Sequence, residues 1–78
     1  MKLRRGVTGD RLIRTLQHIG YSIVRQRGSH VRLHHPGPPA HVVTVPLHNP
    51  LKTGTLHGIL AEVALMRSIS VESLAQLL

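Results

Sequence analysis

Apolar residues near the start of the chain recur with the spacing of an amphipathic helix. They lie three or four positions apart and are Leu12, Ile13, Leu16 and Ile19. Thr8 precedes them as an N-cap, and Gly20 follows them as a stop signal. Arg11, Arg14 and His18 fall on the other side of the same helix. We therefore expect a helix that buries an apolar face and exposes a basic one.

The next part of the chain alternates between apolar and polar residues, which is typical of β-strands. Two runs, residues 21–26 and 30–35, are separated by residues 27–29 (RGS), a glycine-containing loop of the length that hairpins use. In the second run Val31 and Leu33 share one face and are expected to point inward. The residues on the opposite face are His30, Arg32 and His34. The first run alternates less regularly, and which of its faces is buried stays open.

Prolines mark the limits of the third strand. Residues 36–39 (PGPP) form a loop, because proline has no N–H to donate to a neighbouring strand. A third strand-like run follows at residues 41–47, and Pro46 and Pro50 close it and open a loop over residues 47–53. Three antiparallel strands are the simplest arrangement of these runs.

Two further helices follow the predicted strands. The first starts near Thr53 or Thr55, and its apolar positions are Leu56, Ile59, Leu60 and Val63. The second starts at Ser70, and its apolar positions are Val71, Leu74, Ala75 and Leu78. The order is α-β-β-β-α with a short C-terminal helix, and helices covering one face of an antiparallel sheet make an α+β fold. No linker divides the chain, so residues 1–78 are expected to form one domain.

The charge of the chain points to a polyanionic partner. Ten Lys and Arg residues against three acidic residues give a formal charge of +7. Binding to a nucleic acid would use this excess, and plain solubility is the alternative. The chain has no cysteine, and after its basic start at residues 1–5 no apolar run is long enough for a membrane span. We expect a soluble, unprocessed cytoplasmic protein with no membrane partner.

The acidic residues are too few and too scattered for metal-dependent hydrolysis. A two-metal nuclease needs several clustered carboxylates, whereas Asp10, Glu62 and Glu72 are far apart in the sequence. Among the histidines, His30 and His34 would lie about 13 Å apart on one strand, which is too far to share an ion. No cofactor is expected. A zinc site that includes one of the remaining histidines is the alternative, and the candidates are His41, His48 and His57.

His30 is the residue best placed for chemistry on RNA. It begins a strand directly after a glycine-bearing turn, and Arg25, Arg27 and Arg32 lie close to it in the sequence. An imidazole can take up and return a proton near neutral pH, so it can deprotonate a ribose 2′-OH for attack on the neighbouring phosphorus. Guanidinium groups would stabilise the charge that develops. On spacing alone, an ordinary surface histidine among arginines explains the same pattern.

The start of the second predicted helix is a candidate anion site. Lys52 stands just before it, beside Thr53 and Thr55, and no acidic residue occupies its first turn. Free N–H groups and the helix dipole favour an anion there, which in a basic protein is RNA phosphate. An ordinary threonine cap beside a solvated lysine is the alternative.

Residues 25–30 (RQRGSH) combine basic residues with a glycine, a serine and a histidine, and other short segments accompany them in order. Those segments are Gly20 with Tyr21, residues 43–46 (VTVP), His48 and residues 52–56 (KTGTL). Together they resemble the HicA family of bacterial toxins, also called YcfA-like proteins, over roughly residues 7–72. The resemblance implies a fold like that of the double-stranded-RNA-binding domain. It also implies metal-independent cleavage of mRNA, arrest of translation and neutralisation by a HicB-type antitoxin.

The resemblance assigns the catalytic role to His30, and the sequence as a whole predicts an endoribonuclease with this residue as its general base. The residues expected to bind RNA are Arg27, Gly28, Ser29, Arg32 and Lys52. The fold analogy adds phosphate contacts from the first helix at Arg11 and Arg14. His48 is a candidate for the acid that protonates the leaving group. The alternatives are a non-catalytic RNA-binding module and a regulatory subunit that binds the antitoxin. A homodimer and a toxin–antitoxin hetero-oligomer both stay open.

Overall fold

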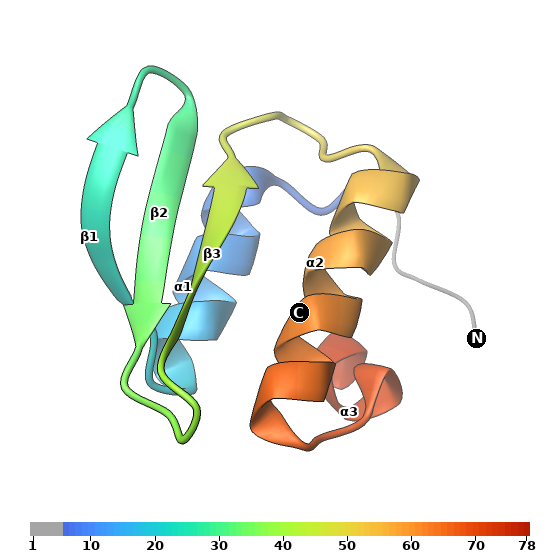
Figure 1. Ribbon diagram of the computed structural model, residues 1–78. Helices are drawn as coiled ribbons and strands as arrows, with labels where there is room; N and C mark the ends of the chain where they lie inside the picture. The colour runs from blue at the N-terminus through green and yellow to red at the C-terminus, as the bar shows by residue number, and fades with distance from the viewer. Residues whose placement is uncertain (1–5) are drawn as a thin grey trace.

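The computed structural model describes residues 6–78, so the basic start at residues 1–5 lies outside the described part of the chain. Its elements in order are α1 (Gly9–His18), β1 (Ser22–Arg27), β2 (His30–His35), β3 (His41–Pro46), α2 (Thr53–Arg67) and α3 (Val71–Gln76). Figure 1 shows α1 behind the strands and α2 alongside β3. This order confirms the predicted α-β-β-β-α arrangement with a short C-terminal helix.

Helix α1 begins and ends at the residues that its sequence predicts. The Thr8 hydroxyl accepts a hydrogen bond from the Arg11 backbone N–H at 3.0 Å, which satisfies one of the unpaired donors of the first turn. At the other end Gly20 adopts a φ of +104°, a conformation that favours glycine and turns the chain out of the helix. Leu12 and Leu16 are fully buried beneath the sheet, as the apolar spacing predicts.

The sheet has the order β1-β2-β3, and both of its strand pairs are antiparallel. Side chains alternate between its faces, so Val31 and Leu33 of β2 and Val43 and Val45 of β3 point toward the helices and are buried. We call the opposite face, which no described helix covers, the outer face. His30 and its neighbours at every second position lie there.

The hairpin between β1 and β2 is tighter than the sequence predicts. We expected a loop of three residues, but Arg27 belongs to β1 and pairs with His30, so that only Gly28 and Ser29 form the turn. Gly28 has a φ of +58°, and a positive φ at the first central position is what a type II′ turn requires. The first strand also begins one residue later than expected, at Ser22, and Tyr21 before it is buried in the core at 2% exposure.

Strand β1 contains a β-bulge at Val24, which explains its irregular pattern. Ile23 pairs with Leu33 and Arg25 pairs with Arg32, so one residue of β1 is extra. Because Leu33 faces the helices and Arg32 faces outward, the bulge changes the alternation of β1 between Ile23 and Arg25. Without it, these two residues would share one face. The bulge therefore places Arg25 on the outer face.

Helices α2 and α3 complete the core. The buried residues of α2 are Leu56, Ile59, Leu60, Val63 and Ala64. Ser70 caps α3 by accepting the Ser73 backbone N–H at 3.0 Å, and Leu74 and Leu78 are buried as predicted. Within residues 6–78 even α2, at 15 residues, falls short of the length and apolar character that a membrane crossing requires.

Two histidines form part of the core, where they contact Tyr21. His41 donates from Nδ1 to the Pro39 carbonyl at 2.7 Å, and its Nε2 shares a hydrogen bond with the Tyr21 hydroxyl at 2.6 Å. His35 accepts the Gly37 backbone N–H at Nδ1, 2.9 Å away, and its Nε2 donates to the Ile19 carbonyl at 3.2 Å. The bond from Gly37 requires the His35 ring to be neutral, since a protonated Nδ1 could not accept it. Burial lowers the pKa of His35 and raises the pKa of Tyr21.

Candidate functional site

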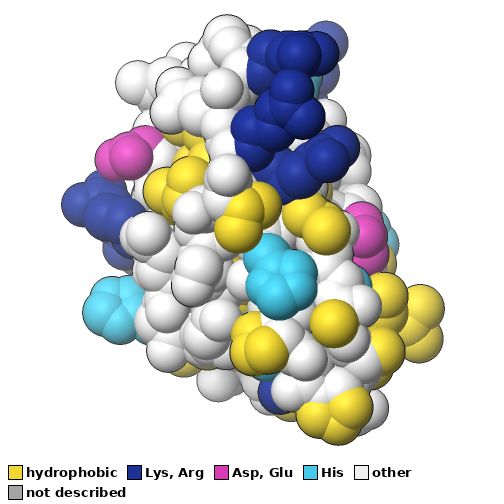
Figure 2. Space-filling view, turned by 60° about the vertical axis from the view of Figure 1, so that its left-hand side comes forward, with side chains coloured by type: hydrophobic (Ala, Val, Ile, Leu, Met, Phe, Trp, Pro, Cys, Tyr) yellow, Lys and Arg dark blue, Asp and Glu magenta, His cyan; other side chains and the backbone are white. Residues whose placement is uncertain are grey.

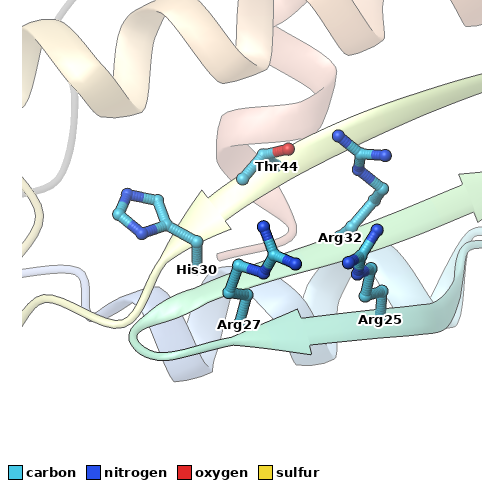
Figure 3. A pocket seen from close by; sticks show the side chains of 5 residues that line it. All are labelled: Arg25, Arg27, His30, Arg32 and Thr44. Carbon is cyan, nitrogen blue, oxygen red and sulfur yellow. The ribbon is translucent and has the colours of Figure 1, made fainter.

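A shallow pocket opens on the outer face of the sheet. It is lined by Arg25, Arg27, His30, Arg32 and Thr44, and we call it the arginine pocket (Figure 3). All three strands contribute to it, since β1 supplies two of the arginines, β2 supplies His30 and Arg32, and β3 supplies Thr44. The local sequence accounts for the arrangement, because strand alternation and the bulge at Val24 direct these side chains to one face.

The pocket consists of two rows of side chains that cross the strands. In the first row Arg27 lies opposite His30. In the second row Arg25 lies opposite Arg32, which in turn lies opposite Thr44. His30 and Arg32 are two positions apart on β2, so the rows are separated by about 7 Å.

The three arginines of the pocket have no acidic partner within residues 6–78. The ion pair of the described residues lies on α1, where Arg14 contacts Asp10 at 3.5 Å. Figure 2 shows the largest group of Lys and Arg side chains at the upper right with no acidic side chain in it, and a second, smaller group at the left edge close to an acidic side chain. Arg25 and Arg32 face each other directly, and like charges in that position repel. The pocket therefore has the electrostatic character of an anion-binding site.

His30 stands at the open end of the pocket beside the hairpin turn. Its side chain is exposed, and no residue of the described chain hydrogen-bonds its ring. The turn that carries it is fixed by the Leu47 backbone N–H, which donates to the Ser29 carbonyl at 2.6 Å. The Gln26 side chain adds a bond to the Gly28 carbonyl at 3.3 Å. His30 thus has a fixed backbone and a ring that a ligand can reach.

The arrangement suits proton transfer next to a bound anion. An imidazole at the edge of the pocket can accept a proton from a hydroxyl of a ligand whose phosphate lies among the guanidinium groups. Arginine presents several N–H donors in a planar fork that matches phosphate oxygens, and the Thr44 hydroxyl can add another donor. This combination is what intramolecular attack on a phosphodiester requires.

The structure brings together some of the residues singled out in the sequence and separates others. Arg27, His30 and Arg32 line the pocket, and Gly28 and Ser29 form the turn beside it. Lys52 and His48 do not line the pocket, and neither do Arg11 and Arg14, which lie on α1. Lys52 is the exposed N-cap of α2 and has no side-chain capping bond, and His48 lies after β3, where its carbonyl accepts the Gly9 N–H at 2.9 Å.

Two residues of the pocket were not predicted to bind RNA. Arg25 belongs to the basic segment before His30, but the irregular alternation of β1 hid the face that it occupies. Thr44 alternates with the apolar residues of β3 and so could have been placed on the outer face from its strand alone.

The described part of the chain contains no cluster of side chains that would support the alternative of a zinc site. Within residues 6–78 no three His, Asp or Glu side chains gather closely enough to hold an ion. Both ring nitrogens of His41 are engaged with Tyr21 and Pro39.

Comparison with known proteins gives one match. The model of the family described as HicA toxin of bacterial toxin-antitoxin matches residues 9–65, which include all three strands and the whole arginine pocket. No curated protein and no solved structure matches the chain. The family match covers most of the 78 residues and agrees with the resemblance seen in the sequence. The chain therefore belongs to the HicA toxin family of bacterial toxin–antitoxin systems.

Proposed function

We propose that the protein is the toxin of a type II toxin–antitoxin system and acts as an endoribonuclease that cleaves mRNA and arrests translation. The observation that carries this proposal is the position of His30 beside three arginines that have no acidic partner among residues 6–78. Family membership implies an antitoxin partner, which we propose to be of the HicB type. The whole chain would act as one domain in the cytoplasm.

In the proposed reaction His30 is the general base. Its imidazole takes the proton of a ribose 2′-OH, and the resulting oxygen attacks the adjacent phosphorus. A 2′,3′-cyclic phosphate forms, the bond to the 5′-oxygen of the next nucleotide breaks, and that oxygen takes up a proton from the solvent that reaches the open face. Arg27, directly opposite His30, stabilises the added negative charge on the phosphate. Lys52, outside the pocket, would hold a more distant phosphate.

The first test is His30→Ala, compared with His34→Ala on the same strand. Neither residue belongs to the apolar core, so both variants should fold with an unchanged circular dichroism spectrum. A positioned general base contributes about 10² to 10⁴-fold, so single-turnover cleavage by His30→Ala should fall by that factor. His34→Ala should stay within a few-fold of the wild-type rate, because His34 does not line the pocket. Cleavage by a folded His30→Ala variant at nearly the wild-type rate would defeat the proposal.

The second test is the effect of a chelator. The described residues offer no cluster of carboxylates and histidines for a catalytic cation, so we propose a reaction without metal. Cleavage in excess EDTA should match cleavage in its absence, measured on one RNA at constant ionic strength. Loss of activity that added magnesium or zinc restores would contradict the metal-free reaction.

A non-catalytic RNA-binding module is the second candidate, and one observation favours it. Catalytic histidines are commonly oriented by a hydrogen bond to their second ring nitrogen, and no described residue supplies one to His30. The two candidates differ in their products. Pure protein incubated with RNA leaves the strands intact if it only binds them, and it generates shorter fragments if it is an enzyme.

A further inference from the structure

We propose that the second row of the arginine pocket, Arg25, Arg32 and Thr44, is a subsite for the phosphate next to the one that is cleaved. The RNA would then cross the outer face of the sheet as a single strand. This inference rests on the proposed function for the position of the cleaved phosphate. The subsite itself can be tested by binding alone.

The separation of the two rows is the first argument. Arg27 and His30 form the reacting row, and Arg25 and Arg32 lie two positions further along their strands, about 7 Å away. This is close to the distance between successive phosphates of one nucleic-acid strand. A backbone that places one phosphate beside His30 therefore brings a neighbouring phosphate over the second row.

The second argument is the charge of that row. Arg25 and Arg32 are direct cross-strand partners and repel each other, and no acidic side chain of residues 6–78 pairs with either. A bound phosphate would accept hydrogen bonds from both guanidinium groups and remove the repulsion. Thr44, opposite Arg32 on β3, extends the row with a hydroxyl donor. The bulge at Val24 is what brings Arg25 into this row.

The third argument concerns the form of the RNA. Attack by a 2′-oxygen requires it to lie opposite the leaving 5′-oxygen, and regular A-form stacking holds the two away from that line. A nucleotide beside His30 must therefore leave helical stacking. The other exposed arginines of residues 6–78 are Arg11 and Arg14, which lie on α1, on the other side of the sheet. A duplex held through α1 would lie on the other side of the sheet from the arginine pocket, so the two binding modes use different arginines.

Binding measurements separate these modes. The probe is a fluorescent single strand of about ten nucleotides of 2′-O-methyl RNA, which has no 2′-OH to react, and a duplex of the same sequence is the comparison. Arg25→Ala and Arg32→Ala should each weaken single-strand binding roughly tenfold or more. Arg11→Ala removes the same charge from α1, where the fold analogy predicted a contact with duplex RNA. A single strand on the outer face does not reach α1, so this variant should change the single-strand affinity by no more than about twofold. Fluorescence anisotropy measures all four proteins.

Two results would overturn the inference. One is an equal loss of affinity in Arg11→Ala and Arg25→Ala, which would mean that only the total charge matters. The other is a duplex that binds wild type at least as tightly as the single strand. Because the probe cannot be cleaved, these outcomes do not depend on catalysis by His30.

A cleavage experiment then tests the register of the strand. The substrate is a DNA strand with one ribonucleotide, so that only one bond can be cut, and a neutral methylphosphonate replaces the phosphate on one side or the other. For wild type, one of the two replacements should slow cleavage roughly tenfold. Arg25→Ala should be slow on the unmodified strand and should lose no further rate with that replacement. Full additivity of the two changes would show that Arg25 does not bind the neighbouring phosphate.

Discussion

Arg25 and Arg32 face each other across β1 and β2 without an acidic neighbour among residues 6–78, so we expect their repulsion to lower the stability of the folded chain. Cross-strand pairs of opposite charge or of apolar residues stabilise a sheet, whereas like charges directly opposite destabilise it. Such a pair is more readily explained by a ligand than by folding.

The substitution Arg25→Thr tests whether the repulsion between Arg25 and Arg32 destabilises the sheet. Threonine suits an exposed strand position and removes the repulsion, so the free energy of unfolding should rise by up to about 1 kcal/mol. Urea titration followed by circular dichroism measures the change. Arg11→Thr, which removes a charge from an exposed position of α1, should give no such increase. A less stable Arg25→Thr variant would mean that the arginine supports the sheet.

The arginines also show how far the positions of single side chains can be predicted from the sequence. Strict alternation placed His30 and Arg32 on one face correctly, since β2 is regular. It could not place Arg25, because a bulge depends on the pairing between two strands, and the irregular alternation of β1 does not show where the extra residue lies. Arg27 was assigned to the turn for a similar reason, since the turn type decides which residue is the last to pair.

Among the elements, α1 approaches the end of β3 unusually closely. A Cβ atom at Gly9 would overlap the Pro46 carbonyl oxygen and stand 3.0 Å from the Leu47 Cα. The Gly9 N–H also donates to the His48 carbonyl at 2.9 Å, and the Leu51 N–H donates to the Val7 carbonyl at 2.8 Å. The first turn of α1 is therefore fixed to the segment that leaves β3, near the end of the sheet that carries His30.

Gly9→Ala should therefore destabilise the fold, by about 1 to 3 kcal/mol, because the backbone it meets has to move. Gly58→Ala is the matched substitution in α2, where nothing lies within 4 Å of the new atom. It should raise stability by roughly 0.5 to 1 kcal/mol, since alanine favours the helix. Thermal unfolding of both variants measures the two predicted changes in stability. Equal effects of the two substitutions would show that the contact of Gly9 with Pro46 is unimportant.

The elements themselves follow from the sequence more completely than the contacts between them. Thr8, Gly20 and Ser70 mark helix ends through local hydrogen bonds and backbone angles, which a short window of sequence contains. The close approach at Gly9 depends on residues more than thirty positions away. No local pattern distinguishes Gly9 from Gly54 or Gly58, which have open space around them.

At the scale of the whole molecule, hydrogen bonds of a neutral histidine stabilise the end of the sheet that lies opposite His30. His35 joins the end of α1, through Ile19, to the loop after β2, through Gly37. Burial lowers its pKa below the ordinary 6.5, and the positive charge of Arg67 lowers it further. The neighbouring His41 and His34 act in the same direction, and the bond to the Ile19 carbonyl opposes them. A proton on Nδ1 would also break the bond from Gly37.

The protein should therefore lose stability in mild acid. The unfolded chain binds a proton at His35 more readily than the folded one, so unfolding is favoured as the pH falls. The contribution of neutral His35 is complete above about pH 6.5 and is lost progressively below it. Urea midpoints at several pH values measure this loss, and His35→Gln should reduce the dependence. The same pH dependence in His35→Gln would assign the effect to other groups.

The outer face of the sheet contributes little to the core, and this has a genetic consequence. If His30 carries the reaction, a single base change in its codon abolishes toxicity and leaves a protein that folds normally. Such a product would still occupy its antitoxin, so a cell that carries it beside an active copy would hold less antitoxin in reserve. Under the proposed function, one mutation would be enough to remove the activity, and it would lower the amount of free antitoxin available to an intact copy of the system.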